Sequence, residues 1–333
     1  MSSADAGAGA KDALMFRLPL SIVSPSGRRG RLSILIFHRV LIEPDALFPE
    51  TPAAAEFEKR MRWVKEWFNV LPLAEAIDLL FAGRIPSRAL AITFDDGYAD
   101  NEALAAIILR RLGLTATVFV TTSFLDGGCM WNDRVIEAFR RCEAAQLDLC
   151  TLGLAAYSLD STAARRAAID AVLDGIKHLE PQERLRVTEA VVQAAGNRPS
   201  PQLMMRTEQV RNLRSLGMDV GAHTVTHPIL TRLDAAAARD EVSRGKRELE
   251  AIVGAPIRLF AYPNGVPNLD YASEHAALVR ECGFSAAVST SWGAASMQSD
   301  RFQLPRFTPW DSTRPRFGAR MLVNLTRTER RAA

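Results

Sequence analysis

Cysteine and histidine are both scarce in this sequence of 333 residues, which limits the disulfides and the histidine clusters that it can form. The four cysteines, Cys129, Cys142, Cys150 and Cys282, form no CxxC pair and no compact framework. We interpret them as reduced thiols of a cytoplasmic protein, although four cysteines also permit two disulfides. With only five histidines in the chain, any cluster of them carries weight.

The sequence also lacks a long apolar run and a large excess of one charge. The apolar stretch over residues 13–23 is broken by Arg17 and Pro19 and has no basic segment before it. It therefore predicts neither a signal peptide nor a transmembrane segment. A net charge of +3, from 41 basic and 38 acidic residues, is too small to predict nucleic acid as a partner. None of these features indicates an oligomeric state.

The length fits either one α/β barrel with an insertion or two modest domains. We predict the first arrangement. A flexible leader is expected over residues 1–30, a barrel over residues 31–312 and a basic tail over residues 313–333.

Short apolar runs alternate with amphipathic segments along most of the chain. Buried strands are predicted at residues 33–37, 89–94, 115–120, 219–222, 258–261 and 286–289. Helices are predicted at residues 53–68, 101–112 and 207–216, and from the cap Asp234 to Gly254. This alternation indicates a parallel sheet with crossover helices.

Residues 132–200 break the alternation and are predicted to form a helical insertion on the barrel. Ile169, Val172 and Ile176 recur on one helical face, and Pro181 is placed to open the next helix. No buried strand is predicted there.

Two adjacent aspartates, Asp95 and Asp96, follow the predicted strand at residues 89–94. In parallel barrels the carboxyl ends of the strands carry the active site. Neighbouring carboxylates repel each other, so they need a cation or a shared proton. Alone, the pair is equally compatible with a solvated Asp–Gly turn.

Two histidines, His223 and His227, follow another predicted strand at the same end of the sheet. Spaced by four residues, they can face the same way. Two imidazoles and one carboxylate form a common catalytic zinc set. An isolated histidine pair is more often structural, but the shared strand-end position favours a metal site.

Two further features lie at predicted strand ends, and a third lies later in the chain. His38 follows the strand at residues 33–37, and a lone histidine has a structural role by default. A rigid turn that could aim N–H groups at an oxyanion contains Tyr262, Pro263, Asn264 and Gly265. The turn is equally compatible with simple packing. Arg306, in the sequence Leu-Pro-Arg-Phe, is weaker evidence and is compatible with a surface cation.

The motifs TFDDG, at residues 93–97, and HTVTH, at residues 223–227, resemble those of the polysaccharide deacetylase family, the NodB-homology carbohydrate esterases. The resemblance extends from residue 32 to residue 307, apart from the insertion. It implies a distorted parallel (β/α) barrel. It resembles the branch in which the catalytic histidine precedes TFDDG, as in poly-N-acetylglucosamine deacetylases of exopolysaccharide systems.

Carried over residue by residue, the resemblance implies that Asp96, His223 and His227 bind a divalent metal ion. Zinc is the favoured ion, and cobalt, nickel and iron are also compatible with this ligand set. Asp95 would be the general base and His38 the general acid. The implied reaction removes N-acetyl groups from a carbohydrate of the N-acetylglucosamine type and releases acetate.

The sequence departs from the family in the turn that would form part of the substrate and oxyanion site. Ala261 stands where the family has an arginine that orients the base, and Asn264 stands where it has a tyrosine. Arg306 is the candidate replacement for that arginine.

Other functions remain open from the sequence. The same site permits hydrolysis of a formamide or a ureide, and a non-catalytic carbohydrate-binding barrel is the alternative outside enzymes. A barrel glycosidase fits less well, because its two acids must flank a bond across roughly 5 Å or more.

Overall fold

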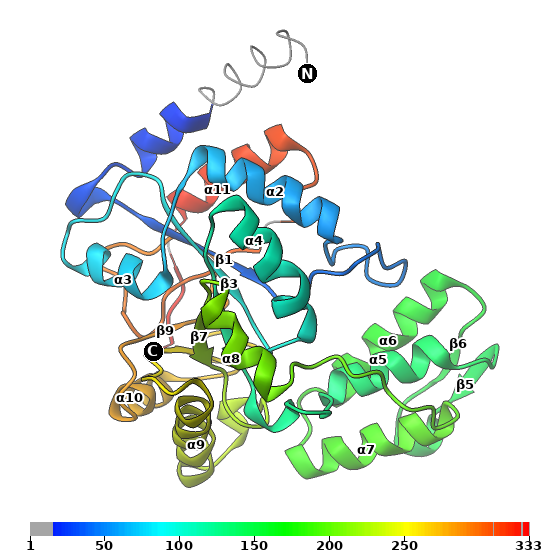
Figure 1. The fold of residues 1–333 in the computed structure, drawn as a ribbon. Helices are drawn as coiled ribbons and strands as arrows, with labels where there is room; N and C mark the ends of the chain where they lie inside the picture. Colours follow the sequence, from blue (N-terminus) through cyan, green and yellow to red (C-terminus); the bar gives the residue numbers. More distant parts are fainter. Residues whose placement is uncertain (1–15, 309, 328, 333) are drawn as a thin grey trace, which may run out of the picture.

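The structure is a computed structural model that describes residues 16–308, 310–327 and 329–332. A parallel sheet curls into a half-barrel at its centre, and helices cover its outer face (Figure 1). A separate group of helices projects from one end of the sheet. The predicted parallel α/β barrel with crossover helices is confirmed.

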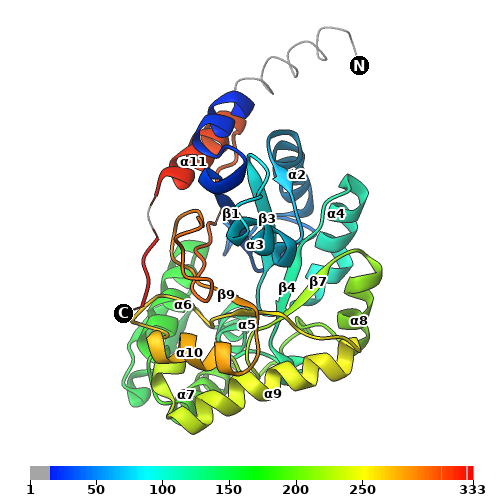
Figure 2. The ribbon, with the colours of Figure 1, turned by 90° about the vertical axis from the view of Figure 1, so that its left-hand side faces the viewer.

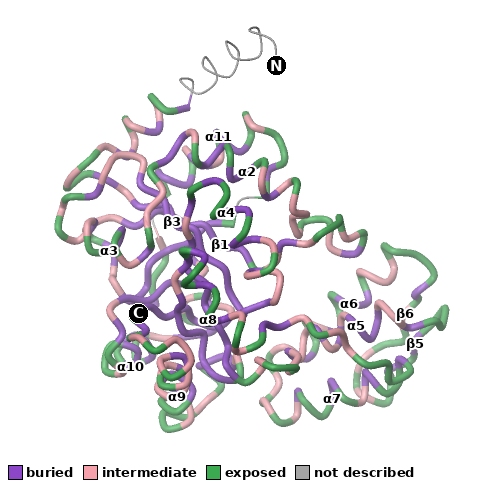
Figure 3. Tube along the Cα trace, in the orientation of Figure 1, coloured by how far each residue is buried: buried purple, intermediate pink, exposed green. Residues whose placement is uncertain are grey.

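The sheet has the strand order β1-β3-β4-β7-β8-β9, with the short strand β2 paired to β3. Its strands are β1 (Leu32–Phe37), β2 (Asn69–Val70), β3 (Ala89–Phe94), β4 (Thr117–Val120), β7 (Asp219–Ala222), β8 (Leu259–Ala261) and β9 (Ala286–Val288). Each predicted strand is present within two residues of its expected bounds. Every residue of β1 and β3 is buried, as the continuous apolar runs indicated, and Figure 3 shows these strands at the buried centre.

Residues 304–307 cross the gap between β9 and β1. Leu304 pairs with Val288 of β9, and Phe307 pairs with Leu35 of β1. The N–H of Phe307 donates to the carbonyl of Ile34 at 2.8 Å. This segment therefore brings two edges of the sheet together and fixes the backbone of the residues between them.

Helices pack around the outside of the sheet (Figure 2). They are α2 (Ala54–Trp67), α3 (Leu73–Phe81), α4 (Ile107–Leu112), α8 (Thr207–Ser215), α9 (Ala235–Val253) and α10 (Ser273–Glu281). The predicted cap Asp234 accepts from the N–H of Ala237, and α9 ends at Gly254 in the left-handed conformation. Gly113 ends α4 in the same conformation. None of the helices among the described residues is long and apolar enough to cross a membrane.

The projecting group of helices lies within residues 132–200 almost entirely. It consists of α5 (Trp131–Arg141), α6 (Thr162–Ile176) and α7 (Pro181–Ala194), with a hydrophobic cluster of its own. Two short, largely exposed strands that the sequence did not predict, β5 (Gln146–Asp148) and β6 (Ala156–Ser158), form an antiparallel pair.

The expectation of a flexible leader does not hold for residues 16–30, and residues 1–15 lie outside the described part of the chain. Residues 16–23 are helical and pack beside the last helix, α11 (Arg314–Thr326), which replaces most of the expected tail (Figures 1 and 2). Aromatic rings account for the difference, since Phe16 and Phe317 both pack against Trp67 of α2. Burial of these rings outweighs the entropy of ordering the two ends.

Phe317→Ala should destabilise the protein by about 3–5 kcal/mol, because it removes a buried ring and leaves a cavity between the terminal helices and α2. Val323→Ala on the same helix is the matched control, since Val323 is exposed and should cost little. Urea unfolding followed by circular dichroism measures both. Equal stability of the two variants would contradict the packing of α11 described above.

Candidate active site

The carboxylate of Asp95 is held by Arg306, which the closing segment 304–307 inserts into the barrel. Nη1 and Nη2 of Arg306 donate to Oδ1 and Oδ2 of Asp95, each at 2.6 Å. Nε of Arg306 donates to the carbonyl of Ser289 at 2.9 Å, and the side chain is fully buried. Burial raises the pKa of Asp95, but the charges of Arg306 and His223 and the hydrogen bonds from Arg306 together outweigh burial and hold that pKa below its usual range.

Asp96 faces the two histidines instead of an arginine. Its Oδ1 lies 3.4 Å from Nε2 of His223 and 3.4 Å from Nε2 of His227. The same oxygen is buried and has no hydrogen-bond partner among the described residues. Ligands about 2.1 Å from a tetrahedral ion lie about 3.4 Å apart, so these three groups fit a divalent cation between them.

The imidazoles are oriented as metal ligands require. Nδ1 of His223 lies 2.8 Å from the carbonyl of Ala261, which fixes the proton on Nδ1 and leaves the Nε2 lone pair facing Asp96. Burial lowers the pKa of His227 to about 4, so this side chain is neutral near pH 7, the form that binds metals. Ala261, which stands where the resembled family usually has an arginine, contributes this carbonyl from its backbone.

Helix α9 supports the turn that carries the histidines. Glu241 accepts hydrogen bonds from the N–H groups of Val225 and Thr226, at 2.9 and 2.8 Å. A side chain at Gly245 would meet the backbone of Thr224 at 3.0 Å, so this glycine allows the close approach. Thr224 has a φ of 65°, a conformation that a β-branched residue adopts only where surrounding contacts impose it. Glu241 was missed from the sequence, where a glutamate in a long helix looks like a solvated residue.

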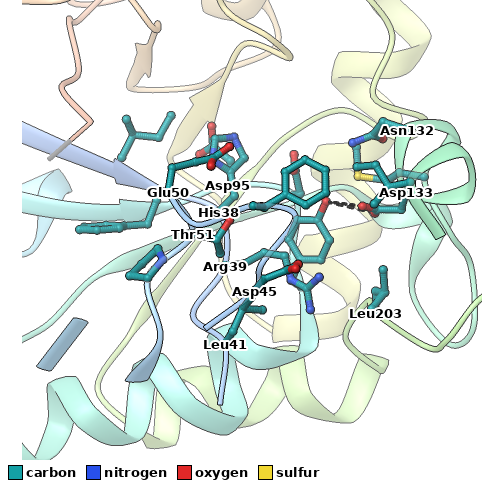
Figure 4. A pocket seen from close by; sticks show the side chains of 18 of the residues that line it. His38, Arg39, Leu41, Asp45, Glu50, Thr51, Asp95, Asn132, Asp133 and Leu203 are labelled. Carbon is teal, nitrogen blue, oxygen red and sulfur yellow. Dashed lines mark hydrogen bonds between the residues drawn. The ribbon is translucent and has the colours of Figure 1, made fainter. Parts of the chain in front are cut away.

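A cavity of about 420 Å³ opens over this centre, and His38 lies on its wall beside Asp95 and Asp96 (Figure 4). His38 is exposed, and its carbonyl accepts from the side-chain amide of Asn101 at 2.8 Å. The imidazole is therefore placed at the barrel mouth and is reachable from solvent.

The turn at residues 262–265 contributes only Asn264 to the cavity wall. The Tyr262 ring is buried, stacks on Tyr271 at 3.9 Å and donates its hydroxyl to the carbonyl of Phe302. Asn264 has a φ of 57°, and its N–H has no acceptor within the described ranges. Pro263 and Gly265 shape the turn, and the N–H of Gly265 donates to the carbonyl of Pro263. Arg306, grouped with this turn from the sequence, instead lies beneath Asp95 and does not line the cavity.

Tyr98 and Asp133 are two residues of the cavity wall that the sequence did not indicate. The Tyr98 hydroxyl donates to Oδ2 of Asp133 at 3.0 Å. Burial, reinforced by the negative charge of Asp96, raises the pKa of Asp133 to about 7. Asp133 lies in the first turn of α5, where an acidic residue is ordinary, so its position in the sequence gave no signal.

Comparison with known proteins supports the resemblance seen in the sequence. The family model described as polysaccharide deacetylase matches residues 82–287. YxkH of Bacillus subtilis (strain 168) is 22% identical over 279 residues, which cover 83% of this chain and 71% of YxkH.

Two solved structures share the fold. One is the Streptococcus pyogenes deacetylase PplD in complex with acetate, with a TM-score of 0.57, 16% identity and coverage of 89% of this chain and 99% of PplD. The other is IcaB from Ammonifex degensii, with a TM-score of 0.54, 16% identity and coverage of 91% of this chain and 99% of IcaB.

Arg306→Leu should destabilise the metal-free protein by about 3–5 kcal/mol, because it leaves Asp95 as a buried carboxylate without a cation. Adding Asp95→Asn should restore much of that stability, since no charge then needs compensation. Urea unfolding of the wild type, both single variants and the double variant, with a chelator present, gives the coupling between the two residues.

The pair of Arg306 and Asp95 also predicts how the stability lost in Arg306→Leu depends on pH. Because the folded pKa of Asp95 is lowered, the stability that the pair contributes is present above the unfolded value of about 4 and is lost as the pH falls through the folded value. The cost of Arg306→Leu should therefore shrink in acid. An equal cost in neutral and acidic buffer would contradict the assignment of a charged pair.

Proposed function

This chain belongs to the polysaccharide deacetylase family, and we propose that it removes N-acetyl groups from an N-acetylated amino sugar with the help of a divalent metal ion. The family consists of hydrolases of carbon–nitrogen bonds other than peptide bonds, and this chain is such an enzyme. The proposed substrate is a carbohydrate of the N-acetylglucosamine type, and the proposed products are acetate and a free amine. The proposal rests on the different partners of the two aspartates. Asp95 is bound to Arg306, whereas Asp96 faces two histidines.

Asp96, His223 and His227 would hold the ion, for which we propose zinc. An ion bound there supplies Lewis-acid chemistry, polarising the amide carbonyl and lowering the pKa of water. The fit rests on the unpartnered Oδ1 of Asp96 and on the two Nε2 atoms that face it. Three protein ligands leave room for a water molecule and the substrate, as catalytic sites require.

Asp95 would act as the general base. Its carboxylate lies beside Asp96, with Oδ2 4.0 Å from Nε2 of His223. Arg306 keeps it ionised and fixes both oxygens, so that one of them can accept the proton of the attacking water. Arg306 would thus orient the base in place of the arginine that the family usually has, although it comes from a different point in the chain.

His38 would act as the general acid, and Asn264 would stabilise the oxyanion. As the carbon–nitrogen bond of the tetrahedral intermediate breaks, the imidazolium of His38 would donate its proton to the amine nitrogen. The free N–H of Asn264 would donate to the oxygen that was the carbonyl of the substrate. A base, an acid and three metal ligands on one cavity wall favour an enzyme over a binding barrel.

The two aspartates should give different phenotypes. Asp95→Asn should keep about one divalent ion per chain and lose most turnover, because an amide cannot accept the proton of water. Asp96→Asn should lose the ion, and with it turnover. The measurements are metal content by plasma mass spectrometry and acetate release from N-acetylglucosamine oligomers.

His223→Ala is the reference variant for metal loss, and it should remain folded. Exchanged phenotypes for the two aspartates would overturn their roles while leaving the site in place. A His223→Ala variant with full metal content and turnover would overturn the metal site itself.

His38→Ala should lower kcat for the amide by about 10²–10⁴-fold while metal content stays unchanged, since a general acid contributes on that scale. The loss should be smaller for an activated aryl acetate ester, whose leaving group needs no proton. The measurement is kcat for both substrates in wild type and variant. An equal loss on both would assign His38 a positioning role, and no loss on either would remove it from the mechanism.

A further inference from the structure

The cavity above the metal ligands extends to the insertion, where α5 forms its far wall. Asn132 and Asp133, in the first turn of α5, line this wall together with Tyr98 (Figure 4). Asp133 is only 5% exposed, although it lines a cavity that admits solvent. A carboxyl group buried at such a place must find polar partners.

Asp133 differs from the other carboxylates on the insertion side of the cavity. Asp45 pairs with Arg140 at 2.6 Å, Glu50 pairs with Arg166 at 2.8 Å, and Glu137 pairs with Arg140 at 3.0 Å. For Asp133 the described residues offer only the Tyr98 hydroxyl as a hydrogen-bond donor. One donor leaves most of the acceptor capacity of a carboxylate unused.

Asn132, the neighbour of Asp133, also has an unused acceptor. Its Oδ1 is buried and has no hydrogen-bond partner among the described residues. Helix capping explains neither side chain, because the residue at the cap of α5 is Met130 and no side chain caps that end. Two neighbouring residues of the cavity wall therefore carry acceptors that need donors from elsewhere.

We propose that Asn132, Asp133 and Tyr98 form a sugar-binding subsite that accepts hydrogen bonds from ring hydroxyl groups of the substrate. The inference rests on the proposed function, since it assumes a carbohydrate in the cavity. A bound ring would bring the donors that both acceptors lack, and it would lie between α5 and the reacting amide.

Arg39 lies close to the subsite and leaves its acceptors open. The guanidinium of Arg39 lies over the Tyr98 ring, 4.9 Å from its centre. It is paired with Asp100, with Nε 2.8 Å from Oδ2, and no hydrogen bond joins it to Asp133 among the described residues. The acceptors of Asp133 therefore remain available to hydroxyl donors.

The test compares a sugar with a substrate that has no hydroxyl groups. Asp133→Asn should lower kcat/KM for the disaccharide of N-acetylglucosamine by about 10-fold, chiefly through KM, as expected for the loss of one or two hydrogen bonds. Turnover of an activated aryl acetate ester should stay close to the wild-type value. Calorimetry should show correspondingly weaker binding of the disaccharide.

Glu137→Gln is the matched control, because Glu137 lies one turn further along α5, also on the cavity wall, but is already paired. It should leave the ratio of sugar to ester activity unchanged. If Asp133→Asn does not fold, Asn132→Ala provides the same comparison, since it removes the side-chain amide that carries the unpartnered Oδ1.

Three outcomes would overturn the subsite: equal losses on sugar and ester, no loss on either, or disaccharide binding that is unaffected by Asp133→Asn. Failure of the proposed function looks different. Wild-type protein that releases no acetate from any acetylated sugar, but binds the disaccharide through Asp133, would refute deacetylation and support the subsite.

Discussion

Two ionised carboxylates stand side by side at the end of β3, and their mutual repulsion has to be balanced because both side chains are buried. Arg306 neutralises Asp95 through two short hydrogen bonds. Because Asp95 is satisfied in this way, Asp96 alone remains for the two histidines and for a cation between them. The difference in partners between two chemically identical neighbours follows from this one ion pair.

The barrel places that ion pair by closing on itself. The segment that joins β9 to β1 is anchored at Leu304 and Phe307, so Arg306 between them has little freedom to move. On the opposite side of the centre, α9 holds the histidine turn through Glu241. The arrangement of the two aspartates and the two histidines is thus fixed by contacts on both sides, and these contacts impose the unfavourable φ of Thr224.

Buried apolar runs predicted the strands well, and since parallel strands end together, they also predicted that Asp95 and His223 would meet. Contacts between distant segments were not predictable in this way. Nothing near Phe16 or Phe317 in the sequence shows that both rings pack on Trp67. Asp133 was missed for the same reason, because its burial depends on how the insertion lies against the barrel mouth. Arg306 could be named as a candidate from the sequence, but its contact with Asp95 required the fold.

The order of the site residues along the chain determines when each becomes available for folding during synthesis. Asp95, Asp96, His223 and His227 all leave the ribosome before Arg306, which is the last of these residues to be made. A nascent chain can therefore bring Asp96 and the two histidines together while the carboxylate next to them still lacks its counter-charge. The ion pair between Arg306 and Asp95 forms only when the final stretch of the barrel docks between its first and last strands.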